Sequence, residues 1–434
     1  MLADKYNIEQ AISLRRAPLA QIEEVQLVLL KRHLLHALSI PFYKKALGIG
    51  KKEIEALSSV AELSQLPFTT REQLDSHADA FGLRNERAFR DIALTSGTTG
   101  NAVVVPYTEA DLKRLAFNEA MAFYGAGVRP EDRVLLTVTL DRCFVAGLAY
   151  YSGITFLGAS AIRSGPGQPA RQWHTINTLK PKIIVGVPTF LRDLGQWALA
   201  EGIDPATSSI KSIITIGESV RQPDHGLTPL GAQLHDLWQA DLYSSYGATE
   251  FETAFSECTM ARGGHVHPEL MLVEVVDDHG RVVADGVSGE VVVTPLGIEG
   301  FPLVRLKTGD ISRLENSPCA CGWNTKRLGP VEGRLAQRLK YKGTTLYPET
   351  IFNILQKVEA VSGAYVEVRT GADGIDDVHV VVGCDDKALD KKFEEMLQAQ
   401  LRVKPTLTVL PPEQVKATMT ADGGRKPRKF FDYR

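Results

Sequence analysis

The stretch with the clearest chemical content is Leu94-Thr95-Ser96-Gly97-Thr98-Thr99-Gly100. Its hydroxyl groups and two glycines suit a loop that wraps a phosphate group, because glycine lets backbone N–H groups approach an anion closely. The stretch is not a Walker loop, since its glycines are too close together and no Gly-Lys-Ser/Thr follows. Taken alone, such a Ser/Thr/Gly loop is most often a simple turn. We call Thr95–Gly100 the phosphate loop.

Four further motifs follow it along the chain: Tyr246-Gly247-Ala248-Thr249-Glu250, Lys307-Thr308-Gly309-Asp310, Gly333-Arg334, and Lys426 within Gly-Gly-Arg-Lys-Pro-Arg. In this order the set resembles the adenylate-forming ligases, a superfamily of acyl-CoA synthetases, adenylation domains and luciferases. Within that superfamily the chain looks like the phenylacetate-CoA ligase family, with landmarks at Ile40-Pro41-Phe42-Tyr43, Leu66-Pro67-Phe68-Thr69-Thr70, Gly186-Val187-Pro188 and Gly217-Glu218. The resemblance covers nearly the whole chain.

The resemblance implies a two-step reaction. A carboxylic acid and ATP give an acyl-adenylate and pyrophosphate, and the thiol of coenzyme A then attacks the adenylate. The first step requires positive charge at the α-phosphate and at the leaving pyrophosphate. The implied partners are therefore ATP, Mg²⁺, CoA and a small acid, which we expect to be aromatic or arylacetic.

The resemblance also implies a role for each matching residue. Thr95, Ser96, Gly97, Thr98, Thr99 and Gly100 would hold the β- and γ-phosphates. In the Tyr246-Gly247 motif the aromatic ring would stack on adenine, Thr249 would touch the α-phosphate, and Glu250 would hold Mg²⁺, a cation that prefers carboxylate and phosphate oxygens.

The remaining nucleotide contacts follow in the same way. Gly217, Glu218 and Ser219 would line the adenine pocket. Asp310 would accept hydrogen bonds from the two ribose hydroxyls, because a carboxylate offers two oxygens to a vicinal diol. Arg334 would add a ribose or phosphate contact. Lys426 would contact the substrate carboxylate and the α-phosphate, and with Thr249 and Glu250 it would be catalytic.

The chain departs from the family pattern at three places. Asn101 stands where relatives have a lysine after the second glycine, which removes a positive charge from the loop. At the hinge, where relatives have two aspartates, the chain has Ala336 and Gln337. In the tail, Arg425 and Lys429 stand where relatives have glycine and arginine.

The cysteines suggest a second site. Cys319-Ala320-Cys321-Gly322 lies in a Pro/Gly loop, and Cys258 precedes His265 and His267. Three sulfurs and one nitrogen suit a tetrahedral structural zinc, and some phenylacetate-CoA ligase relatives carry a similar set. We expect Cys258, His265, Cys319 and Cys321 as ligands, with His267 left open as the alternative to His265. The other interpretation is four loop residues that never meet. Cys143 and Cys384 are expected in the core.

The acid pocket is the least specific prediction. The candidates by position are Phe144, Ala146, Gly186, Val187, Pro188 and Tyr243. Each of them could equally be a core residue. They indicate an apolar slot of aryl size without specifying the acid.

Composition limits the alternatives. The chain has 434 residues, 44% hydrophobic and 23% charged, with a formal net charge of −3. This balance favours neither nucleic acid nor an anionic membrane as partner. No apolar run reaches the ~20 residues that cross a bilayer, and the N-terminus does not resemble a signal peptide. Five cysteines in so long a chain indicate a reducing cytoplasm rather than a disulfide scaffold. The sequence leaves a homodimer open.

The motifs need a scaffold, which the hydrophobic pattern outlines. Helical spacing covers residues 9–37, and short helices follow over 50–80. Buried strands at 91–94, 133–139, 182–187 and 211–216 alternate with helices at 109–126 and 168–179, which predicts an α/β fold with a largely parallel sheet flanked by helices. Short strands at 272–277, 281–284 and 290–294 predict a small antiparallel region.

Beyond Arg334 the pattern restarts as a smaller α+β unit. Helices at 349–358 and 386–401 and strands at 363–369, 378–384 and 406–410 predict a separate two-layer core. We therefore expect an adenylation core at 1–334 and a C-terminal domain at 335–434. The resemblance implies that this domain is a mobile lid.

Three functions remain at this stage. The first is an ATP-dependent acid–CoA ligase. The second is an enzyme that passes the acyl group to a carrier-protein thiol or an amine. The third is a nucleotide-binding protein without turnover, which the presence of Thr249, Glu250, Asp310, Arg334 and Lys426 argues against.

Overall fold

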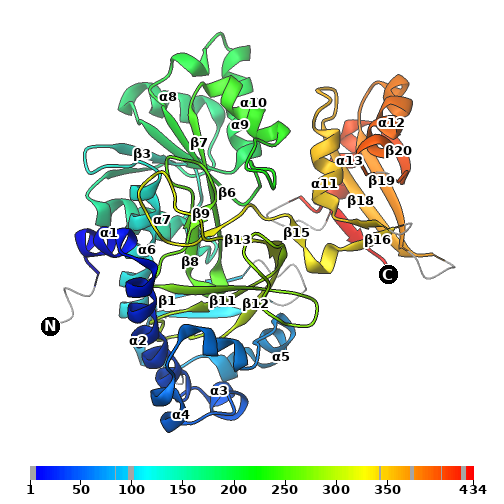
Figure 1. Ribbon diagram of the computed structural model, residues 1–434. Coiled ribbons are helices and arrows are strands. Elements are labelled where there is room, and N and C mark those ends of the chain that lie inside the picture. Colours follow the sequence, from blue (N-terminus) through cyan, green and yellow to red (C-terminus); the bar gives the residue numbers. More distant parts are fainter. Residues whose placement is uncertain are drawn as a thin grey trace. The chain divides into compact units, whose positions relative to one another are not determined.

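The computed structural model of the chain describes residues 6–83, 85–95, 102–341, 344–371, 376–401, 403–421 and 427–434. The chain forms two compact units, one of residues 1–227 and 231–330 and one of residues 331–434 with 228–230 (Figure 1). In the part of the chain that the structure describes, no helix has the length and apolar character needed to span a bilayer.

The larger unit contains a six-stranded sheet in the order β4-β3-β5-β6-β7-β8, parallel except for the last strand. Its central strands are largely apolar and buried, as in Ile183–Val185 and Ile213–Ile216, because both faces of a parallel sheet are covered. The strands are β3 (Arg133–Leu136), β4 (Ser160–Arg163), β5 (Ile183–Gly186), β6 (Ser212–Ile216), β7 (Asp241–Ala248) and β8 (Thr253–Ser256).

Helices cover both faces of this sheet. α6 (Glu109–Gly125) and α7 (Val145–Leu157) pack on one face, and α8 (Pro169–Leu179), α9 (Pro188–Ala200) and α10 (Pro229–Trp238) pack on the other. The sequence pattern predicted α6 and α8. It missed α7, α9 and α10; of these, α7 is apolar on nearly all sides, which leaves no helical period to detect.

An antiparallel sheet forms the second part of this unit, from β10 (Met271–Val276), β11 (Gly289–Pro295) and β12 (Leu306–Ser312). The strand predicted at 281–284 is wrong, since Val282 makes only an isolated bridge to Val276 and is half-exposed. The Asp277 carboxylate accepts from the backbone of His279 and Arg281 and closes a tight turn there instead. A smaller sheet joins β13 (Leu314–Glu315), β14 (Arg327–Leu328) and β9 (Gly264–His265).

The phosphate loop connects two strands of a hairpin, β1 (Phe89–Leu94) and β2 (Val104–Thr108). The strand predicted at 91–94 is present, but the prediction that it is buried is wrong, because Ile92 and Leu94 are 50% and 39% exposed. The connection from Thr95 to Val103 is too short for the crossover that a parallel pair needs, so the two strands pair antiparallel.

Helices near the N-terminus pack beside the antiparallel sheet. The single helical stretch predicted at 9–37 is divided in two around Pro18, whose fixed φ suits a helix start. The helices are α1 (Ile8–Arg16), α2 (Leu19–Ala37), α3 (Pro41–Ala46), α4 (Lys51–Ala56) and α5 (Arg71–Phe81), with short 3₁₀ turns at Val60–Gln65 and Glu86–Ala88.

The smaller unit has its own core around the sheet β20-β19-β18-β21. The strands β18 (Gly363–Thr370), β19 (Asp376–Gly383) and β20 (Thr406–Leu410) and the helices α11 (Pro348–Leu355) and α12 (Asp390–Leu401) lie near their predicted positions. The pattern missed α13 (Pro412–Thr420), which packs on Tyr365 and Val381 at the opposite face of the sheet, and it missed the edge strand β21 (Phe430–Asp432), which pairs parallel to β18. Short strands β15 (Gly333–Arg334), β16 (Leu339–Tyr341) and β17 (Thr344–Leu346) precede α11.

Candidate functional site

The predicted residues of the larger unit gather where its parallel strands end. Pro188 follows β5, Gly217 to Ser219 follow β6, and Thr249 and Glu250 follow β7. Carboxyl ends of parallel strands meet at one edge of a sheet, and ligands of open α/β folds bind there. The fold therefore brings motifs that are far apart in sequence to one edge.

A hydrogen bond joins the predicted adenine and ribose motifs. The Tyr246 hydroxyl donates to Oδ2 of Asp310 at 2.7 Å. The Tyr246 ring stacks on Phe255, with centroids 6.0 Å apart and planes 18° apart. Asp310 follows Gly309, whose φ of +75° lies in the left-handed region that favours glycine, and the Asp310 amide donates to the Thr308 hydroxyl. The Tyr246 hydroxyl thus orients the Asp310 carboxylate, and the turn at Gly309 fixes its backbone.

Glu250, the predicted magnesium ligand, pairs with a cation that the sequence analysis missed. Nη1 of Arg71 donates to Oε1 of Glu250, Nη2 lies 3.4 Å from the Thr95 hydroxyl, and Nε donates to Asp75 at 2.8 Å. The Thr95 hydroxyl also accepts from the amide of Val103 at 2.9 Å. The first residue of the phosphate loop and the carboxylate of Glu250 therefore share one guanidinium.

The residues after β6 serve the local structure directly. Gly217 has a φ of +78°, and Ser219 donates to the carbonyl of Arg221 at 2.8 Å. The Glu218 carboxylate accepts from the amide of Thr189 at 3.0 Å, in the first turn of α9. A carboxylate at this end of a helix satisfies a backbone donor that the helix leaves unpaired. Glu218 therefore fixes α9 against the loop predicted to line the adenine pocket.

The acid-pocket candidates occupy different environments. Ala146, Val187 and Tyr243 pack against one apolar cluster between α6, α7 and the sheet. Phe144 is the half-buried residue that precedes α7, and Pro188 begins α9 as a buried residue. At Gly186 a Cβ would lie 2.4 Å from the Thr137 hydroxyl, so close packing requires glycine there. Burial raises the pKa of Tyr243 to about 12.

Beside these candidates lies a buried carboxyl group that the sequence analysis also missed. Glu119 on α6 is 4% exposed and accepts from the amide group of Asn118 at 3.0 Å. Burial raises the pKa of Glu119 to about 8, and the negative charge of Glu119, after burial, raises that of Tyr150 on α7. The sequence indicated a helix at this position but not the burial of Glu119, because a glutamate in a helix is usually exposed to solvent.

Some predicted residues cannot be placed against this site. Ser96, Gly97, Thr98, Thr99, Gly100 and Lys426 lie outside the described residues. Arg334 is exposed on β15, which belongs to the smaller unit.

The Cys/His residues form a compact cluster. One ligand atom from each of Cys258, His265, Cys319 and Cys321 lies within 4.8 Å of all the others. The sulfurs of Cys258 and Cys319 are 3.6 Å apart, and Nε2 of His265 is 3.5 Å from the sulfur of Cys321. Tetrahedral zinc, with bonds of about 2.0–2.3 Å, needs ligand atoms roughly 3.5–3.8 Å apart, so the donor set fits this metal in chemistry and spacing.

The surroundings of the cluster favour a bound cation. The Thr325 hydroxyl lies 2.8 Å from Nδ1 of His265, which leaves Nε2 directed at the sulfurs. A hydrogen bond from Cys258 lowers the pKa of Cys321, while that bond and burial raise the pKa of Cys258 itself. Thiolates packed this closely repel one another, so a divalent cation would stabilise them together.

His267 has a different role from His265. Its Nδ1 lies 2.6 Å from Nη2 of Arg15, whose Nη1 donates to Glu269 at 2.7 Å. Burial holds the pKa of His267 well below its usual range, so the ring is neutral and accepts from the guanidinium. His267 thus anchors α1 to the core and stands apart from the sulfur cluster.

Of the two remaining cysteines, one departs from its prediction. Cys384 is buried, as expected, but Cys143 is exposed. Cys143 lies in the loop before α7 with a φ of +54°, and its carbonyl accepts from the amide of Leu94. The loop uses the backbone of Cys143 and directs its side chain to solvent.

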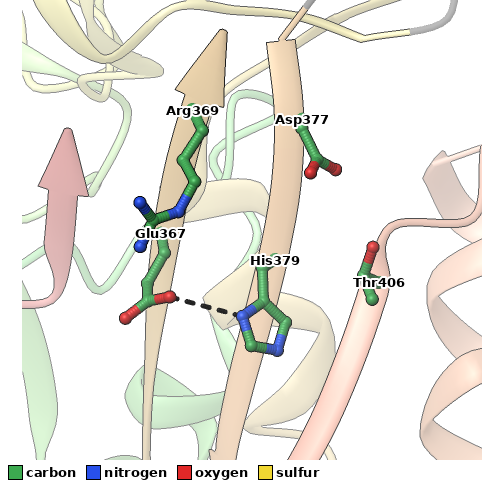
Figure 2. Close-up of a pocket in the computed structure, with 5 residues that line it drawn as sticks. All are labelled: Glu367, Arg369, Asp377, His379 and Thr406. Atoms are coloured by element: carbon green, nitrogen blue, oxygen red, sulfur yellow. Dashed lines mark hydrogen bonds and ion pairs between the residues drawn. The ribbon is translucent and has the colours of Figure 1, made fainter. Parts of the chain in front are cut away.

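The smaller unit has a separate hollow on the face of its sheet. Glu367 and Arg369 from β18, Asp377 and His379 from β19, and Thr406 from β20 line it (Figure 2). Nδ1 of His379 lies 3.3 Å from the Glu367 carboxylate, and its Nε2 lies 2.9 Å from the Thr408 hydroxyl. The His379 ring is thus paired on both nitrogens, and none of the lining residues belongs to the predicted site.

The family model for AMP-binding enzymes matches residues 47–298. The chain belongs to the AMP-binding enzyme family. This match includes the phosphate loop, the residues after β5, β6 and β7, and two of the four cluster residues. It confirms the superfamily that the sequence motifs indicated.

Curated relatives agree with the narrower resemblance. The phenylacetate-coenzyme A ligase of Thermus thermophilus is 28% identical over 428 residues, which cover 91% of this chain and 92% of that protein. The enzyme of the same name from Escherichia coli is 25% identical over 400 residues, with 89% and 88% covered. A crystal structure of 2-hydroxyisobutyryl-CoA ligase in the postadenylation state, with R3-HIB-AMP bound, shares the fold with a TM-score of 0.85. It is 19% identical and the alignment covers 100% of this chain and 94% of that one.

Proposed function

We propose that the chain is an AMP-forming acid–CoA ligase. It activates a carboxylic acid with ATP as an acyl-adenylate, releases pyrophosphate, and transfers the acyl group to the thiol of CoA. The observation that carries this proposal is the hydrogen bond between Tyr246 and Asp310, with Glu250 directly after the strand that contains Tyr246. The chain also resembles phenylacetate-CoA ligases over about nine-tenths of its length.

In this reaction the Asp310 carboxylate binds the ribose hydroxyls, and Tyr246 orients it and stacks on the base. Thr249 and Glu250 follow directly and serve the α-phosphate and Mg²⁺. A magnesium ion at Glu250 would supply charge to the phosphates when bound. Lys426 presents its charge to the carboxylate during the first step only, since it belongs to the smaller unit, which we propose to act as a mobile lid.

We propose an aromatic or arylacetic acid as substrate. The support is the names of the curated relatives and the apolar environment of Ala146, Val187 and Tyr243. The candidate side chains carry no charge, which suits the uncharged end of such an acid. We also propose that the protein works in a reducing cytoplasm, because its cysteines are free thiols. Such a compartment suits both the thiol of CoA and the Cys/His cluster.

We further propose a structural zinc bound by Cys258, His265, Cys319 and Cys321. All four positions would be filled by protein, so the metal would have no open position for water and no direct part in catalysis. It would connect the loop after β8 to the loop before β14 and thereby brace the antiparallel region that carries Asp310.

Acid-dependent exchange of labelled pyrophosphate into ATP tests the first step over a panel of carboxylic acids. We expect exchange with aromatic acids and formation of the acyl-CoA when CoA is the sole acceptor. Exchange without thioester formation would favour a carrier-protein or amine acceptor. Absence of exchange with every acid, while ATP still binds, would favour the nucleotide-binding protein without turnover.

A further inference from the structure

Arg71 contacts two parts of the nucleotide site that lie 155 positions apart, Thr95 and Glu250. Its side chain is 32% exposed and that of Glu250 15%, so the pair is accessible to a ligand while partly shielded from water. Water still reaches both side chains and screens part of their attraction, so a ligand charge can compete for either partner.

The position of Arg71 is set by the backbone two residues earlier. The amide of Thr69 donates to the carbonyl of Arg305 at 3.0 Å, and the amide of Lys307 donates to the carbonyl of Thr69 at 2.9 Å. The Thr69 hydroxyl also donates to the carbonyl of Val304 at 2.7 Å. Thr70 then caps α5, whose first residue is Arg71. A strand edge and a helix cap thus hold this guanidinium beside the site.

The phosphate loop itself supplies no positive charge. Residues 95–101 contain no lysine or arginine, and Asn101 stands where the resemblance implies a lysine. Breaking the bond between the α- and β-phosphates places negative charge on pyrophosphate, which needs a cation in addition to Mg²⁺. A guanidinium has five donors and suits phosphate oxygens, so it can replace an ammonium group there.

We propose that Arg71 binds the β- and γ-phosphates of ATP and neutralises the leaving pyrophosphate in place of the missing loop lysine. This proposal rests on the ligase function proposed above. Without nucleotide, Arg71 pairs with Glu250. When Mg²⁺ and ATP bind, Glu250 turns to the metal and the two terminal nitrogens of Arg71 turn to phosphate, while Nε keeps its bond to Asp75.

The test compares affinities for MgATP and AMP by calorimetry in Arg71→Ala, because AMP lacks the two phosphates concerned. A hydrogen bond to a charged group is worth about 1.5–3 kcal/mol, which corresponds to a loss of roughly 10- to 150-fold for MgATP. AMP affinity should change by less than about threefold. Arg71→Lys should retain part of the MgATP affinity, and the Michaelis constant for pyrophosphate should rise in parallel with the loss.

A second variant tests the exchange of charge directly. Adding Asn101→Lys to Arg71→Ala should recover most of the MgATP affinity, and failure to recover it would overturn the replacement of the loop lysine. Asp79→Asn is the matched control, since it removes an exposed acidic charge from α5 and leaves both Arg71 and its partner Asp75 in place; its ATP-to-AMP affinity ratio should match that of the wild type. Should Arg71→Ala not fold, Arg71→Gln allows the same comparison.

Two outcomes would refute a phosphate contact. An equal loss of AMP and MgATP affinity would mean that Arg71 only supports the fold. A loss for ATP that disappears when Mg²⁺ is chelated would mean that Arg71 acts only through Glu250. These outcomes are separate from failure of the ligase function, in which the wild type would bind MgATP and yet catalyse no acid-dependent exchange.

Discussion

The phenolic oxygen of Tyr246 lies 2.7 Å from Oδ2 of Asp310, although 64 positions separate the two residues. Tyr246 belongs to the parallel sheet and Asp310 to the antiparallel sheet, so their hydrogen bond joins the two sheets of the larger unit at the nucleotide site. A carboxylate has two oxygens and several lone pairs, so this bond can orient Asp310 and still leave it able to accept from a diol.

This relationship predicts graded effects on ATP binding. Asp310→Ala should raise the Michaelis constant for ATP by roughly 10- to 100-fold in pyrophosphate exchange, because two ribose hydroxyls lose a charged acceptor. Tyr246→Phe keeps the ring and removes only the orienting hydroxyl, so its increase should be several times smaller. An unchanged ATP dependence in Asp310→Ala would mean that the turn after Gly309 is only structural.

Lys426→Ala should separate the two half-reactions. Removal of this charge should slow adenylate formation by about 10²–10³-fold, a typical effect of losing charge stabilisation in a site that excludes water. Attack of CoA on synthetic acyl-adenylate should keep its rate. Lys416→Ala, an exposed lysine of α13, is the control. Pyrophosphate exchange at the wild-type rate in Lys426→Ala would contradict the assigned role.

Elemental analysis should find about one zinc per chain in protein purified without chelators. Cys319→Ser/Cys321→Ser should lose the metal, lower the melting temperature and weaken ATP binding, without changing which acid is preferred. Cys143→Ser, at the exposed cysteine, should keep the metal. Metal-free wild-type protein, together with an unchanged melting temperature in the double variant, would leave the four residues as a packed cluster only.

Glu119 predicts a pH dependence of stability. Burial raises its pKa from 4.5 to about 8, so the folded chain holds a proton that the unfolded chain releases between these values. Stability should therefore fall as pH rises from about 4.5 to about 8. Glu119→Gln keeps an acceptor for Asn118 and removes this dependence, so its melting temperature should exceed the wild-type value by more at pH 8 than at pH 5.

The control for this measurement is Glu109→Gln at the exposed start of α6, where a hydrogen bond from Lys113 lowers the pKa of the carboxyl. It should show no extra gain at pH 8. An equal shift for Glu119→Gln at both pH values would mean that the carboxyl is ionised in the folded chain.

The sequence predicted the fold class and the superfamily because both depend on local patterns. Runs of β-branched apolar residues such as Ile213–Ile216 favour a strand that is buried on both faces. The order of short motifs such as Thr308-Gly309-Asp310 is characteristic of a family. Such signals require no knowledge of which segments meet in space.

The contacts that complete the site could not be predicted in this way. Arg71 reads as an ordinary first residue of a helix, and only the fold brings it to Glu250, 179 positions away. Glu119 reads as a solvated helix residue, and only the packing of α7 on α6 buries it. The pairing of β1 with β2 in a hairpin was missed for a related reason. The residues of a strand do not show which strand it pairs with, whereas the short connection between β1 and β2 requires an antiparallel pair.

The backbone bonds of Thr69 to β12 also have a consequence for synthesis of the chain. Their partners lie about 235 positions further along, so a chain that grows at roughly 5–20 residues per second spends tens of seconds with Arg71 made and β12 not yet translated. A nascent chain stopped before Leu306 contains the whole phosphate loop but has neither Asp310 nor the strand that positions Arg71. Nucleotide can therefore stabilise this protein only late in translation, and the early helices must remain soluble on the ribosome without it.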